Sequence, residues 1–324
     1  MSNIVSLNMP AAYWLDKARH ARSAVDPSDA IRFYTAAIRQ DSDVARLELA
    51  ELYIELGCFS AAERCLLHNL QKSAHDVNSF FALGRCHNAL GDIEAMAELF
   101  DLFLRLFPSG AKSDAARDIL WHLPRRAPVA RHTHRAAALF NQSTSRSQNA
   151  ALKLLLKSYK IRPTAPAAGA ICEVFLQMRL TSQAIRYGYE AIRLDPSYAD
   201  HRLHLACCLE AAGLHRSAAL TLQEAEKYCD TPYKALRLCS CAIQLNQFDV
   251  ELTVSEKWRK KYPFSAEFLQ MHLASLRADL SLWGQALSLL PLARTIDPED
   301  LALQAYAAMD WDKENFINED NNKE

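Results

Sequence analysis

Helix-like stretches of mixed apolar and polar residues end at a proline several times along this chain. The stretches FLRLFP, KSYKIRP, YEAIRLDP, WRKKYP and ARTIDP end at Pro108, Pro163, Pro196, Pro263 and Pro298. Successive prolines are 55, 33, 67 and 35 residues apart, and Pro196 and Pro298 are 102 apart. Because 102 is three times 34, the spacing indicates a repeat of about 34 residues, a period typical of a two-helix unit.

Small residues recur at matching places within each period. In residues 198–230 we expect a first helix to end at Gly213 and a second to begin near His215. Two antiparallel helices approach closely only where both carry small side chains, glycine permits the turn, and proline ends the second helix. Three units share the small positions Cys172, Ala184 and Ala191; Ala206, Ala218 and Ala225; and Ala274, Ala286 and Ala293.

This pattern resembles the tetratricopeptide repeat, whose positions favour Trp, Leu-Gly, Tyr, Gly, Ala, an aromatic residue, Ala and Pro. The first unit fits at Trp14, Ala18, Ala21, Ala30, Tyr34 and Ala37, and the third at Leu83, Gly84, Gly91, Phe100 and Pro108. The expected glycine is replaced by Val25, Arg146 and Gln247 in the first, fourth and seventh units. The resemblance implies an all-α, right-handed α-solenoid of about eight tandem helix hairpins with a C-terminal capping helix. The units begin near residues 11, 43, 77, 132, 165, 199, 232 and 267.

The period divides the chain into five segments. N-terminal repeats cover 1–108, an irregular helix and a basic connection cover 109–131, and C-terminal repeats cover 132–298. A capping helix is expected at 299–309 and a disordered acidic tail at 310–324. Within the irregular segment, Ser113 is expected to cap the start of a helix.

Composition narrows the classes of function. Lys and Arg total 37 and Asp and Glu total 38, so the net charge of −1 gives no general attraction to nucleic acid or membrane. The N-terminus lacks the features of a signal peptide, and no apolar run reaches the roughly 18 residues of a membrane span. The nine cysteines at irregular spacing are therefore interpreted as free thiols in a reducing cytoplasm.

Catalytic and metal-binding motifs are missing from the sequence. It contains no G-x-x-x-x-G-K-S/T, G-x-G-x-x-G, H-E-x-x-H or G-x-S-x-G motif, so we predict no catalytic activity and no cofactor. In DHRLHLACC, His201, His204 and Cys208 lie at i, i+3 and i+7 and could face a zinc ion. Both cysteines of this stretch fall where the repeats use small packing residues, so no metal site is predicted.

The resemblance places a partner on the concave face, which the first helix of each unit lines with positions 2, 5, 9 and 12. We expect a non-catalytic scaffold that binds a peptide or protein segment in this groove. Arg85 and Asn88 match part of the set that chaperone-binding relatives use, but Glu51 stands where a second asparagine would be expected. The groove positions are Arg19, Arg22, Glu51, Phe81, Arg85, Asn88, Phe140, Glu173, Cys207, Glu210, Phe268 and Met271.

Two other functions remain open from the sequence. One is a self-assembling scaffold, in which repeat faces pair two chains; the oligomeric state is not predicted. The other is a regulatory module that contacts nucleic acid through the basic segment 125–135, which carries Arg125, Arg126, Arg131 and Arg135. Because aromatic residues are not interleaved with these arginines, nucleic acid is the less favoured partner.

Overall fold

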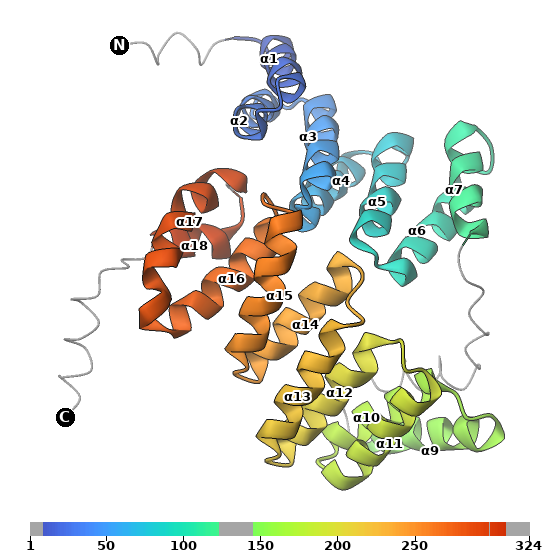
Figure 1. Ribbon diagram of the computed structural model, residues 1–324. Helices are drawn as coiled ribbons and strands as arrows, with labels where there is room; N and C mark the ends of the chain where they lie inside the picture. Colours follow the sequence, from blue (N-terminus) through green and yellow to red (C-terminus); the bar gives the residue numbers. More distant parts are fainter. Residues whose placement is uncertain (1–8, 123–144, 298, 309–324) are drawn as a thin grey trace. The chain divides into compact units, whose positions relative to one another are not determined.

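The structure, a computed structural model, describes residues 9–122, 145–297 and 299–308 (Figure 1). Over these ranges all regular secondary structure is helical, and the helices follow one another as hairpins. The expected fold class, an all-α array of tandem helix hairpins, is confirmed. The chain divides into two compact units: unit 1 comprises Met1–Leu123 and Ser255–Glu324, and unit 2 comprises Pro124–Val254.

The first part of unit 1 consists of consecutive hairpins followed by a single helix. The helices are α1 (Ala11–Ser23), α2 (Pro27–Ile38), α3 (Asp43–Leu56), α4 (Phe59–Lys72), α5 (Val77–Leu90), α6 (Ile93–Leu106) and α7 (Ala111–Trp121). The unit starts expected near residues 11, 43 and 77 coincide with the first residues of α1, α3 and α5. The repeat period therefore locates these hairpins correctly.

Capping residues determine where the helices of these hairpins begin and end. The Ser42 hydroxyl accepts a hydrogen bond from the Ala45 N–H at 3.3 Å and starts α3. Gly57 ends α3 with a left-handed φ of 78°, and Gly91 ends α5 in the same way at 84°. In the first hairpin Val25 takes this position with a φ of 60°, where a β-branched residue is strained. The replacement of the turn glycine by Val25 thus changes the residue but keeps the turn.

Small residues at the contacts allow the helices to approach closely. Ala18, Ala30 and Ala62 are fully buried at the helix contacts of the first two hairpins. At Gly84 of α5, a Cβ atom would lie 2.7 Å from Cζ of the buried Phe100 in α6. Because real Cβ atoms do not approach so closely, only glycine fits there without movement of the ring.

Helices from the end of the chain complete unit 1. They are the second half of α15 (Phe248–Lys261), α16 (Ala266–Ala278), the 3₁₀ helix η2 (Leu280–Leu282), α17 (Trp283–Ile296) and α18 (Leu301–Ala308). The last helix, α18, contacts both α16 and α17. A helix that packs on the last hairpin therefore lies where the C-terminal capping helix is expected.

Contacts between residues far apart in the sequence join the two parts of unit 1. The Cys58 thiol, just before α4, donates a hydrogen bond to the Phe264 carbonyl at 2.7 Å. On α4, Arg64 pairs with Asp297 at 2.5 Å, and the Asp297 side chain is buried. The sequence division into 1–108 and 132–298 follows the repeat period alone, which does not specify which repeats pack together across the chain.

Unit 2 is a run of consecutive hairpins. Its helices are α9 (Ser145–Ile161), α10 (Ala165–Gln177), α11 (Thr181–Leu194), α12 (Ala199–Ala211), α13 (His215–Glu226), α14 (Pro232–Gln244) and the first half of α15. The turns carry left-handed residues at Arg179, Gly213 and Asn246, with φ values of 58°, 74° and 54°. The expectation that Gln247 takes the glycine position is wrong by one residue: Asn246 takes it, and asparagine tolerates this conformation.

The helix expected after Pro108 begins earlier than predicted. α7 starts at Ala111 with Gly110 as its N-cap residue, so Ser113 lies inside the first turn and is not the cap. The Ser113 side chain is buried, and its hydroxyl donates to the Phe107 carbonyl at 2.8 Å. Ser113 therefore connects α7 to the end of α6.

Candidate functional site

The predicted groove arginines of the first hairpin are engaged by the second hairpin. Arg19 on α1 forms a two-pronged pair with Glu48 on α3, with Nη2 2.5 Å from Oε1 and Nε 3.0 Å from Oε2. The hydrogen bond to Glu48 raises the pKa of Arg19. Arg22 on α1 pairs with Glu55, also on α3, at 2.5 Å. These arginines therefore connect α1 to α3, and a partner would have to compete for them.

The remaining predicted residues of unit 1 differ in how accessible they are. Phe81 is half-buried and packs on Phe100 and Phe103, with ring centroids 5.7 and 5.8 Å apart. It therefore fills the hairpin of α5 and α6. Arg85 and Asn88 are exposed on α5, and Arg85 has no ion-pair partner among the residues the structure describes. Three other predicted positions, all half-buried or buried, are Glu51, Phe268 and Met271.

In unit 2 the predicted acidic residues lie on the first helices of two consecutive hairpins. Glu173 on α10 and Glu210 on α12 are half-buried. Oε1 of Glu210 lies 2.6 Å from Nδ1 of His215. Oε2 of Glu210 is buried and has no hydrogen-bond partner among the residues that the structure describes. A buried carboxylate oxygen without a donor is unfavourable, so this position is suited to receive one from outside.

Polar residues that were not predicted for the groove lie on the same first helices. Arg237 on α14 reaches Asp200 on α12, with Nε 3.4 Å from Oδ1, and also donates to the Tyr233 hydroxyl at 3.3 Å. Burial acts against the charge of Arg237, but the bond to Tyr233 and the charge of Asp200 raise its pKa overall. Asp200 and Tyr233 occupy the second position of their units, so the same positional rule could have found them.

His204 on α12 is a second unsatisfied group on this face. Its Nδ1 atom is buried and has no hydrogen-bond partner. Burial lowers the pKa of His204, and the charge of Glu173 opposes that effect. His204 is the sixth residue of its unit, outside the groove positions 2, 5, 9 and 12, so the positional rule did not assign it to the groove. We define the acidic face of unit 2 as Glu173, Asp200, His204, Glu210 and Arg237.

The possible metal ligands of the DHRLHLACC stretch point to different neighbours. His201 is buried and packs edge-on against Tyr198, with centroids 4.9 Å apart. The sulfur of Cys208 contacts the sulfur of Cys172 at 3.4 Å. Within the described ranges no three His, Cys, Asp or Glu side chains form a group that could hold a metal ion. His201 and Cys208 thus serve packing in this structure.

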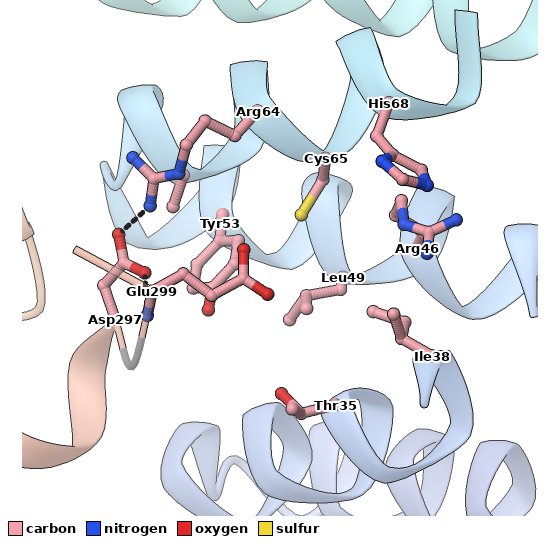
Figure 2. A pocket seen from close by; sticks show the side chains of 11 residues that line it. Thr35, Ile38, Arg46, Leu49, Tyr53, Arg64, Cys65, His68, Asp297 and Glu299 are labelled. Atoms are coloured by element: carbon pink, nitrogen blue, oxygen red, sulfur yellow. Dashed lines mark hydrogen bonds and ion pairs between the residues drawn. The ribbon is translucent and has the colours of Figure 1, made fainter. Parts of the chain in front are cut away.

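A cavity of about 270 Å³ lies in unit 1 between α2, α3, α4 and the segment after α17 (Figure 2). Arg64 points to Asp297 across one end, and the Cys65 sulfur points into the space. Burial raises the pKa of Cys65 to about 12, so the thiol stays protonated. The lining residues are Thr35, Ile38, Arg46, Leu49, Tyr53, Ala61, Arg64, Cys65, His68, Asp297 and Glu299.

Several predicted residues lie outside the described ranges. They are Phe140, the basic segment 125–135 with its four arginines, and the tail 310–324. Among the helices that are described, none is both long and apolar enough to cross a membrane.

Comparison with known proteins returns tetratricopeptide-repeat structures. The TPR2AB-domain:pHSP90 complex of yeast Sti1 is 17% identical, with a TM-score of 0.31, covering 76% of this chain and 98% of that one. The P58(IPK) TPR domain is 14% identical, with a TM-score of 0.36 and coverage of 97% and 99%. Yeast Tom70 is 12% identical, with a TM-score of 0.35 and coverage of 95% and 82%. No family model and no curated protein sequence matches the chain.

The two units have the architecture that the repeat pattern predicts. Helices α3 and α4, each of 14 residues, form one such hairpin, and first helices of consecutive hairpins, such as α3 and α5, contact one another. The resemblance to the tetratricopeptide-repeat family is thus confirmed at the level of the fold. At identities and TM-scores this low, the solved structures carry no argument about partner or activity.

Proposed function

We propose that this chain is a protein-binding scaffold, and that the acidic face of unit 2 holds a polypeptide segment that carries a lysine or arginine. The observation that carries this proposal is the buried Oε2 atom of Glu210, which has no hydrogen-bond partner. A cationic donor from a bound segment would satisfy that oxygen and gain a charge-assisted hydrogen bond. Glu173 on the neighbouring first helix adds a second carboxylate to the same face.

The other charges of this face support a basic partner group close to Glu210. Arg237 is already paired with Asp200 at 3.4 Å, so its charge is partly neutralised within the unit. Because burial lowers the pKa of His204, this side chain is neutral at pH 7 and does not repel a cation. Among the described residues, no lysine or arginine forms an ion pair with Glu173 or Glu210.

The test uses a displayed library of random peptides selected against the full chain. We expect the selected peptides to carry lysine or arginine and to bind the Glu210→Gln variant about tenfold more weakly or worse, since a charged hydrogen bond is lost. Glutamine retains an oxygen that can accept a hydrogen bond from His215, so the fold should be kept. Thermal unfolding of the variant verifies this.

The matched control removes one negative charge elsewhere in unit 2. Asp249 is exposed near the start of α15, and Asp249→Asn should leave peptide affinity unchanged. Selected peptides without a basic residue, or equal affinity for the wild type and the Glu210 variant, would reject the proposal. The predicted groove residues of unit 1 can be tested with the same peptides through Arg85→Glu, which disturbs no ion pair within the described residues.

The two alternative functions stay predictions. Self-assembly would appear as a concentration-dependent mass in sedimentation. Nucleic-acid binding through segment 125–135 would appear as retention on DNA or RNA at low salt that is lost as salt is raised.

A further inference from the structure

Cysteine pairs join the first helices of consecutive hairpins in unit 2. All nine cysteines of the chain are free thiols. The sulfurs of Cys207 on α12 and Cys241 on α14 are 3.6 Å apart. Those of Cys172 on α10 and Cys208 on α12 are 3.4 Å apart. The pairs are separated by 34 and 36 residues, about one repeat, so each joins equivalent places on neighbouring first helices.

We propose that Cys207 and Cys241 are a reversible redox site that forms a disulfide with a hydroperoxide oxidant, whereas Cys172 and Cys208 remain thiols in the folded chain. The proposal is independent of the proposed function, because the thiol chemistry needs no bound partner. It depends on contact between two sulfurs and on the different access of the two pairs to solvent.

Contact distance makes both pairs chemically competent for a disulfide. An S–S bond is about 2 Å long, so sulfurs already 3.6 Å apart need to approach by roughly 1.5 Å, which small side-chain rotations can supply. The two first helices that carry Cys207 and Cys241 are in contact. Geometry alone would favour the Cys172–Cys208 pair slightly, so access must decide between them.

Access to the oxidant separates the two pairs. Cys207 is half-buried and Cys241 is 8% exposed, but Cys172 and Cys208 are both 0% exposed. We therefore expect a hydroperoxide to reach Cys207 more readily than Cys172 or Cys208. Cys65 in unit 1 is also half-buried, but no second cysteine is in hydrogen-bond contact with it among the described residues.

Ionisation favours the same cysteine as the nucleophile. The hydrogen bond from Cys241 lowers the pKa of Cys207, and the same bond together with burial raises the pKa of Cys241. Because the thiolate is the reactive form, Cys207 attacks the peroxide and Cys241 acts second. The bond to Cys172 and burial raise the pKa of Cys208, which keeps that thiol protonated.

The reaction balances in two steps. The Cys207 thiolate attacks one peroxide oxygen, so an S–O bond forms, the O–O bond breaks, and the second oxygen leaves as water or alcohol after taking a proton. Cys241 then attacks the sulfur of this sulfenic acid, so the S–S bond forms, the S–O bond breaks and water leaves. Two thiols lose two electrons and the hydroperoxide gains them. A dithiol reductant reverses the change.

The test treats the reduced full chain with hydrogen peroxide in non-denaturing buffer, blocks the remaining thiols, and maps disulfide-linked peptides by tandem mass spectrometry. We expect a link between Cys207 and Cys241 that a dithiol reductant removes. In Cys241→Ser, which lacks the second sulfur, dimedone should trap Cys207 as a sulfenic acid at least about tenfold more than in the wild type.

Neighbouring cysteines provide matched controls. Cys239→Ala, two residues from Cys241 on the same helix, and Cys208→Ala, next to Cys207, should both keep the link. Circular dichroism verifies that each variant is folded. The link in the wild type tests the proposal without any variant. The proposal is overturned if the folded wild type forms no link, if Cys172 and Cys208 are linked first, or if dimedone traps no sulfenic acid at Cys207 in Cys241→Ser.

Discussion

The two compact units of the chain are built from the same kind of helix hairpin, and they differ in the residues that join one hairpin to another. In unit 1, arginine–glutamate pairs connect α1 to α3, and Arg64 and Asp297 connect segments 233 residues apart. In unit 2, Arg237 and Asp200 pair α14 with α12, and two cysteine contacts that span 34 and 36 residues also join first helices. Hairpin geometry therefore sets where neighbouring helices meet, and the side chains at that place decide how strongly and how reversibly they are joined.

Two ion pairs, one from each unit, differ in which partner is buried. In unit 1 the acid, Asp297, is 2% exposed and its partner Arg64 is partly exposed. In unit 2 the base, Arg202, is 3% exposed and its partner Glu224 is exposed. Arg202 also donates to a backbone carbonyl at 2.6 Å and stacks on the Tyr228 ring. Arg202 thus has other support, and Asp297 is more dependent on its one charged partner.

Removal of the acid from each of these two pairs should give the largest difference in the free energy of unfolding. Asp297→Ala leaves Arg64 and the Glu299 N–H without their acceptor and should lower the free energy of unfolding by about 2–3 kcal/mol. Glu224→Ala should lower it by about 1 kcal/mol or less, since that carboxylate is exposed. Urea unfolding measures both values. Hydrogen exchange should show that the stability lost in Asp297→Ala is lost in unit 1. An equal or larger cost for Glu224→Ala would contradict the comparison.

Substitutions of glycines at close helix contacts should show a smaller difference in stability between the two units. A Cβ at Gly84 would lie 2.7 Å from Cζ and 2.8 Å from Cδ1 of Phe100, whereas one at Gly188 would lie 3.1 Å from Cδ1 of Leu205. Gly84→Ala should cost about 2 kcal/mol through overpacking. Gly188→Ala should be near neutral, because alanine's helix propensity, worth about 1 kcal/mol, offsets the tighter contact. Thermal unfolding of the two variants measures the contrast; similar costs would refute it.

Buried histidines make both units sensitive to acid. Burial lowers the pKa of His272 in unit 1 and of His201 in unit 2 to about 4. The unfolded chain, with a histidine pKa of about 6.5, binds more protons between pH 6.5 and 4, so stability falls as pH falls through that window. After allowance for solvent screening, each histidine should account for about 1 kcal/mol of the loss.

The variants His272→Gln and His201→Gln isolate the two histidine contributions. Each should flatten the dependence of the unfolding free energy on pH between 6.5 and 4, and their effects should add because the residues belong to different units. Urea unfolding at several pH values measures this. A pH profile that neither variant changes would exclude the histidines as its cause.

The smallest expected effect is a gain in stability at a turn. Val25 has a φ of 60° and is 84% exposed, so Val25→Gly relieves backbone strain without loss of packing. The gain should be about 0.5–1 kcal/mol, because relief of roughly 1–2 kcal/mol is partly offset by the flexibility of glycine in the unfolded chain. Arg179→Gly, the equivalent change in unit 2, should gain less, since arginine is not β-branched. Differential scanning calorimetry compares the two; a loss of stability at Val25 would contradict the strain.

The sequence predicts the hairpins well because their cause is local. The period near 34, the alanines at contacts and Gly57, Gly91 or Gly213 at turns follow from how two short helices can pack. The error at Gln247 has a local cause too: alignment to a glycine position overlooked asparagine, which adopts the same φ. Boundaries such as the start of α7 depend on a single cap and are less predictable.

The candidate site is less predictable because it depends on side chains that reach beyond one repeat. The positional rule placed Glu173 and Glu210 on first helices but could not reveal that Arg19 is long enough to pair with Glu48 of the next hairpin. The pairing of Arg64 with Asp297 joins residues 233 positions apart, which no local period encodes. His204 is the sixth residue of its unit, so the groove positions did not include it, and the metal-ligand spacing pointed to a different role.

The long-range contacts of unit 1 have a consequence for biosynthesis. During translation, Cys58 leaves the ribosome long before Phe264, which follows 206 residues later. At about 5–20 residues per second, the first hairpins wait on the order of ten to forty seconds for their partners. Unit 2, one continuous segment, can complete its folding in that interval, so the order of synthesis makes the middle of the chain mature before its two ends.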